Sequence, residues 1–123
     1  MFSHEQNWIM RQIKAIADTI AAIIFRKAEI SYEIQDETNH TETDILFLRL
    51  NKMLDDGDIN GAEDALFEQL NPTDINYLLL AVDFYQRLNE KSDEELECDG
   101  FSRDEVKDGI SEIMEIYGIM PAS

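Results

Sequence analysis

Cysteine, histidine and proline are scarce in this chain, and the scarcity excludes several kinds of site. The 123 residues include one cysteine, two histidines and two prolines. A single cysteine forms no internal disulfide. One cysteine and two histidines are also too few for a Cys/His zinc site. The five glycines are scattered, so the sequence contains no glycine-rich phosphate loop. We therefore expect no cofactor.

Basic residues are also scarce. Ten Lys and Arg stand against 27 Asp and Glu, giving a net charge of −17. Such a chain repels phosphate backbones and anionic lipid, so we expect neither nucleic acid nor a membrane as partner. The most apolar stretch, residues 8–25, is interrupted by Arg11, Lys14 and Asp18 and is no membrane span. Residues 1–7 do not resemble a signal peptide, which predicts a cytoplasmic protein with Cys98 reduced.

Helix signals dominate what remains. Ser3 and Gln6 form a capping-box pattern. Isoleucines then recur at spacings of 4, 3, 4 and 3, and we call this set the isoleucine seam: Ile9, Ile13, Ile16, Ile20 and Ile23. This spacing predicts an amphipathic helix over residues 1–34, although Ile30 to Ile34 alternates and could equally be a short extended piece. Residues 35–43 are wholly polar and are interpreted as a mobile linker.

Charge divides the chain at the same place. Residues 1–30 carry a net charge of +1, which leaves −18 for the rest. Residues 44–123 are expected to form an acidic helical bundle, with Gly57 ending one helix, Asn60 and Asn71 capping the next two, and Ser92 and Ser102 capping the last two. The residues from Ile75 to Leu88 are apolar nearly all round, which is typical of a central helix. The predicted fold class is all-α, with five or six helices.

The stretch from Leu50 to Tyr85 resembles a degenerate tetratricopeptide-type hairpin. It shares the Gly57-Asp58 turn, small residues in the second helix and Pro72 before a further helix. Over most of its length the chain also resembles a family of small acidic helical proteins from low-GC Gram-positive bacteria, classed only as a domain of unknown function. The matching pieces are Trp8 to Ile13, Gly57-Asp58 through Ala62-Glu63, Phe84-Tyr85 and Tyr117-Gly118.

One loop resembles a metal site. Asp56 to Gly61 matches the opening of a calcium loop, with oxygen side chains at alternate positions and a glycine at the turn. The twelfth position, where a glutamate should close the cage, is Phe67. The match therefore favours a tight turn between helices. A weak divalent-metal site or an enzyme centred on Asp56, Asp58 and Asn60 is the alternative.

The isoleucine seam has two interpretations. In the first, the helix packs against the acidic bundle of its own chain. In the second, it meets a second copy or another protein through residues 8–25. The regular heptads, the linker and the bulky neighbours favour the second interpretation. We therefore expect a non-catalytic interaction module, homodimeric through its seam, with an acidic mimic of nucleic acid as a third possibility. The expected interface comprises Trp8, Ile9, Ile13, Ile16, Ile20, Ile23 and Ile24.

Overall fold

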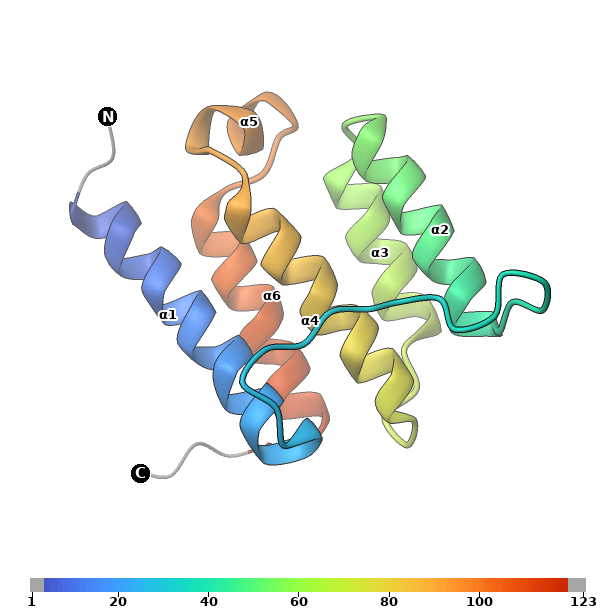
Figure 1. Cartoon of the computed structure of the whole chain (residues 1–123). Coiled ribbons are helices and arrows are strands. Elements are labelled where there is room, and N and C mark those ends of the chain that lie inside the picture. Colours follow the sequence, from blue (N-terminus) through green and yellow to red (C-terminus); the bar gives the residue numbers. More distant parts are fainter. Residues whose placement is uncertain (1–3, 120–123) are drawn as a thin grey trace.

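The computed structural model describes residues 4–119, and the regular structure within that range is entirely helical (Figure 1). This confirms the predicted all-α class. Its elements are α1 (His4–Ile20), the short π-helix η1 (Ala21–Phe25), α2 (Glu42–Asp55), α3 (Ile59–Gln69), α4 (Ile75–Glu90), α5 (Asp93–Cys98) and α6 (Arg103–Ile116).

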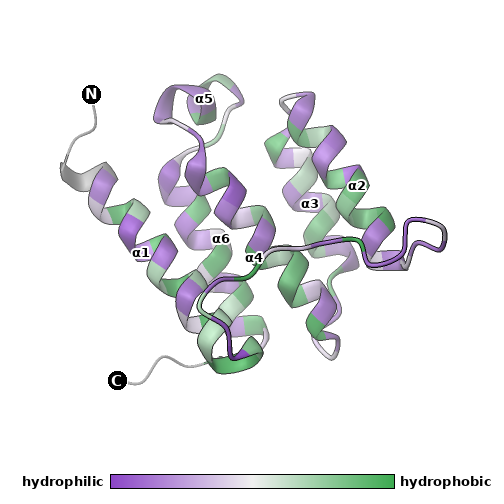
Figure 2. Ribbon diagram, viewed as in Figure 1, coloured by the Kyte–Doolittle hydropathy of each residue, from purple (hydrophilic) through white to green (hydrophobic). Residues whose placement is uncertain are grey.

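Helix α4 is the centre of the molecule, as its apolar sequence predicts. It packs against α6, α1 and α2, while α2 and α3 form a helical hairpin beside it (Figure 1). Figure 2 shows hydrophobic residues along the helix faces that meet around α4. Burial of apolar surface on several sides of one helix is the main stabilising contribution in a fold of this kind. The buried residues of α4 are Tyr77, Leu78, Leu80, Ala81, Val82, Asp83, Phe84, Tyr85 and Leu88.

The N-terminal helix is not held away from this body. Helix α1 lies against α6 and α4, which corresponds to the first of the two interpretations, in which the seam packs on its own chain. The helix is also shorter than predicted, because the helical structure ends at Phe25 rather than near residue 34. Residues 26–40 then cross α4 without helical structure on their way to α2 (Figure 1). Ile30 and Tyr32 are buried in that stretch, which is why the segment follows the body instead of hanging free.

Two of the predicted turns have different caps from those expected. Gly57 ends α2 with a φ of +78°, as predicted for a glycine in the left-handed region. Asp58, and not Asn60, caps α3, because its carboxylate accepts from the Gly61 amide. The predicted cap Asn71 forms a local turn with Thr73 instead, and α4 begins only after its cap Asp74.

The serine caps were predicted correctly. Ser92 and Glu95 form a reciprocal capping box at α5, and the Ser102 hydroxyl accepts from the Glu105 amide at α6. Ser3, predicted to cap α1, lies outside the described residues.

Arg103 joins the ends of three helices. Its side chain is buried, and its guanidinium donates to the carbonyl oxygens of Asn89 at 2.8 Å and Lys91 at 2.7 Å, and to the Asp93 carboxylate at 2.9 Å. The carbonyls at a helix C-terminus have no partner within the helix. Arg103 supplies that partner for α4 and fixes α5 and α6 to its end.

Candidate functional site

The predicted isoleucine seam is mostly part of the protein's own core. Ile9, Ile13 and Ile20 are buried with Ala17 and Ala21, and Ile16 and Ile24 pack partly buried against the same core. In this fold, the three buried isoleucines are already covered by their own chain and are not available to a second one. The wide apolar stripe of α1 packs against α6 and α4.

Two of the predicted interface residues remain at the surface. The side chains of Trp8 and Ile23 are 53% and 52% exposed. Residues Trp8, Arg11, Ala15 and Ala22 recur at spacings of three, four and seven, which places them on one stripe of the helix. All four are exposed, and Ile23 lies next to that stripe. We call this stripe, with Ile23 and the exposed basic side chains Lys14, Arg26 and Lys27, the outer face of α1.

The outer face of α1 is positive although the chain is strongly negative. Residues 8–27 contain four basic residues and one acidic residue, a net charge of +3, which leaves −20 for the remainder of the chain. Lys14 is paired with Asp18 at 2.9 Å, but both side chains are largely exposed and such a pair contributes little to stability. Lys107 of α6 adds a further positive charge, with its Nζ 5.8 Å from the centre of the Trp8 ring.

The π-helix shapes the lower end of this face. Arg26 follows η1 in the left-handed region with a φ of 54°, and the Lys27 amide donates to the carbonyl of Ala21 at 3.1 Å. A non-glycine residue in this region is uncommon and costs energy. The turn reverses the chain at the foot of α1, where Figure 2 shows a hydrophobic end to the helix. It leaves Ile23, Arg26 and Lys27 exposed together.

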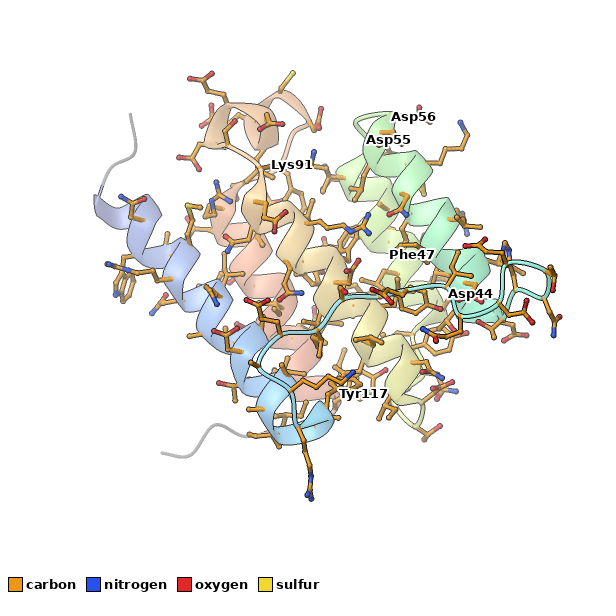
Figure 3. The ribbon with its side chains drawn as sticks, in the orientation of Figure 1. Asp44, Phe47, Asp55, Asp56, Lys91 and Tyr117 are labelled. Carbon is orange, nitrogen blue, oxygen red and sulfur yellow. The ribbon has the colours of Figure 1, made fainter. Side chains whose placement is uncertain are left out.

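The segment after that turn is held to the body by a polar network. The Tyr32 amide donates to Asp83 at 3.0 Å, and the Tyr32 hydroxyl donates to Asp44 at 2.5 Å. The rings of Tyr32 and Phe47 lie 4.7 Å apart, and Gln86 donates to the carbonyl of Ile30 at 3.0 Å. Figure 3 shows Asp44 and Phe47 on α2 where the segment reaches that helix. This network was missed from the sequence, although the alternation of Ile30 to Ile34 was its local signal.

Asp83 is the buried acid of that network. Its side chain is only 8% exposed, and its second oxygen lies 2.9 Å from the Nε of Arg87. Burial raises the pKa of Asp83, while the bonds from Tyr32 and Arg87 oppose the shift. Arg87 also donates to Asn51 at 2.7 Å and lies over the Phe47 ring. These groups satisfy one another, so the arrangement fixes the segment between α4 and α2.

The residues of the loop that resembles a calcium site, for which a tight turn was the favoured prediction, are engaged in other contacts. Asp56 is the C-cap of α2 and lies 3.7 Å from Lys52, and the Asp58 carboxylate caps α3. Asn60 donates to the carbonyl of Gly100 at 3.2 Å. Figure 3 shows Asp55 and Asp56 at the C-terminal end of α2. Within residues 4–119, no three acidic, histidine or cysteine side chains gather in a way that could hold a metal ion.

A second charged surface lies between α3 and α6. A groove of about 410 Å³ is lined by Glu63, Asp64 and Phe67 from α3 and by Glu105, Asp108, Gly109 and Glu112 from α6; we call it the acidic groove. Tyr85 lies against it, because its hydroxyl donates to Glu63 at 2.6 Å. Burial raises the pKa of Glu63, opposed by that bond and reinforced by the neighbouring carboxylates. This groove was not predicted, because it depends on two helices distant in sequence.

The comparisons with known proteins point to one family. No helix in the described part of the chain is long and apolar enough to span a membrane. Neither the curated proteins nor the solved structures include a match. A family model described as a family of unknown function (DUF6483) matches residues 3–118, nearly the whole chain. The chain therefore belongs to this family of unknown function, DUF6483.

Proposed function

We propose that this protein is a non-catalytic interaction module that binds a protein partner through the outer face of α1. The observation that carries the proposal is the exposure of Trp8 and Ile23 on a positive helix face in a chain of net charge −17. Tryptophan and arginine are the residues most enriched where protein interfaces are strongest. The proposal keeps the expected region of contact, residues 8–25, but moves the contact from the buried seam to the opposite side of the helix.

The chemistry of this face favours an acidic partner. Arg11, Lys14, Arg26 and Lys27 are exposed around the apolar side chains. Ala15 and Ala22 are small, and small residues let a second surface approach the helix closely. Complementary charge speeds association and selects the partner more than it strengthens the complex. The proposal includes a cytoplasmic location. The exposed thiol of Cys98 would stay reduced in that compartment.

A photo-crosslinking residue at position 15 tests the proposal in the cells that make the protein. Ala15 lies within the outer face, so we expect a specific covalent adduct with a protein, identified by mass spectrometry. The matched control carries the same residue in place of the exposed Glu94 on α5. Equal adducts from both positions, or none from position 15, would contradict the proposed surface. The identity of the adduct separates a second copy of this chain from a foreign protein.

A further inference from the structure

We infer that the partner of the outer face of α1 is a second copy of this chain, which presents its acidic groove. The inference rests on the proposed function and names the occupant of the proposed surface. It joins two different faces of the same protein, one positive and one negative, in a head-to-tail contact.

Charge argues for two unlike faces. In a two-fold dimer built on α1, the +3 of residues 8–27 would face another +3 while the bodies, at −20 each, also repel. In a head-to-tail contact, Arg11 and Lys14 of one copy meet carboxylates of the next. Opposite charges then offset part of the repulsion between the bodies. The acidic groove suits this role because five carboxylates line it and no basic side chain does.

The dimensions of the two faces also agree. Asp108 and Glu112 follow Glu105 at spacings of three and four on α6, so the three form one row. Glu105 and Glu112 are seven positions apart, and so are Trp8 and Ala15, which is about 10 Å of helix in each case. Each face also offers one aromatic side chain, Trp8 on α1 and Phe67 on the α3 wall of the groove.

The state of the groove carboxylates supports a cationic occupant. The Glu63 carboxylate accepts one hydrogen bond, from the Tyr85 hydroxyl. Burial is the main cause that raises the pKa of Glu63, and the nearby carboxylates of Glu105, Asp64 and Glu112 raise it further. Like charges held this close disfavour one another's ionised form. Arginine and lysine side chains from a second copy would relieve that repulsion.

A head-to-tail contact leaves one free face of each kind at the ends. It therefore grows with concentration into short chains or closes into a ring, instead of stopping at a dimer. Because it depends on charge, added salt has two opposed effects. Salt weakens the contact itself, and it also screens the general repulsion between acidic bodies. Charge reversal at each face is the sharper test.

Three double variants of the full chain separate the possibilities. Reversing the positive face, Arg11→Glu with Lys14→Glu, changes the net charge from −17 to −21. Reversing the groove, Asp108→Lys with Glu112→Lys, changes it to −13. The control Glu94→Lys with Glu97→Lys also reaches −13 but alters exposed positions on α5. All six positions are exposed, so the fold should be retained, as circular dichroism can verify.

Sedimentation velocity measures the result. We expect wild-type chain and control to associate at high protein concentration and each face variant to remain monomeric alone. Mixing the two face variants should restore association into one-to-one pairs, so the average mass should rise from that of the monomer toward twice that value. Trp8 is the single tryptophan, so its emission should shift to shorter wavelength in the mixture as well. Circular dichroism of the separate variants guards against misfolding as the cause.

Several outcomes would overturn the inference. A wild-type chain that stays monomeric at high concentration contradicts it. So does association of either face variant alone to the wild-type extent, or failure of the mixture to associate. The proposed function is tested separately. If position 15 forms an adduct with a foreign protein and the wild-type chain is monomeric, the outer face of α1 is still an interaction surface, but its partner is not a second copy of this chain.

Discussion

Replacement of Gly109 by alanine tests how closely α6 approaches α4. A Cβ atom at this position would lie 2.3 Å from the Cε1 of Tyr85 and 2.4 Å from its Cζ and hydroxyl oxygen. Ordinary contacts are longer than 3.4 Å, so the ring or the helix would have to move by about 1 Å. Tyr85 has no free side to move toward, because its side chain is fully buried and its hydroxyl is bonded to Glu63.

The expected cost follows from two opposed effects. Overpacking a filled core costs about 1–3 kcal/mol, and a fully enclosed ring favours the upper end of that range. Alanine in place of glycine within a helix contributes about 1 kcal/mol in the other direction. We therefore expect Gly109→Ala to lower the free energy of unfolding by about 2 kcal/mol, a large part of a total of about 5–15 kcal/mol.

Urea denaturation followed by circular dichroism measures this change. The control is Ser111→Ala in the same helix, which gains helix propensity and should be slightly stabilising. In a Tyr85→Leu background the cost of Gly109→Ala should largely disappear, because the ring that it meets is gone. If Gly109→Ala instead raised the denaturation midpoint as Ser111→Ala does, the argument from close approach would be refuted.

Three further predictions concern the buried polar groups. Arg103→Met should lower the free energy of unfolding by about 3 kcal/mol in urea denaturation, because it leaves carbonyls at the end of α4 and a carboxylate without their donor. Tyr32→Phe should raise the pKa of Asp44, measured by NMR titration, since the bond from the Tyr32 hydroxyl is the main cause that lowers it; an unchanged titration would contradict that bond. Glu63→Gln tests the raised pKa of Glu63. Because this pKa is higher in the folded than in the unfolded state, the folded protein binds the proton first, and the free energy of unfolding should increase as the pH falls from 7 toward 5. Thermal melts of wild type relative to this variant should show that gain, and a constant difference across the range would refute it.

Local signals in the sequence determined the helical class and several of the helix ends. The Gly57 turn and the Ser92 capping box were predicted correctly because each depends on residues within one turn of helix. The central position of α4 was likewise evident, since only a helix covered on several sides is apolar nearly all round. The difference in charge between the N-terminal helix and the rest is also a property of the sequence alone.

The tertiary structure decided which face of α1 is free. A heptad seam has the same pattern whether it meets its own body or a second chain, so the sequence could not distinguish the two. The structure places Ile13 and Ile20 in the core and leaves Trp8 and Ile23 outside. The candidate surface therefore retains Trp8 and Ile23 of the expected interface but lies mostly outside the isoleucine seam.

Long-range polar contacts were equally beyond the sequence. The bond from Tyr32 to Asp83 joins residues 51 positions apart, and that from Tyr85 to Glu63 spans 22 positions. No local periodicity marks such partners, because they depend on which helices become neighbours. These neighbours are set by packing around α4. Residues 26–40 cross that helix, and α3 and α6 form the two walls of the acidic groove.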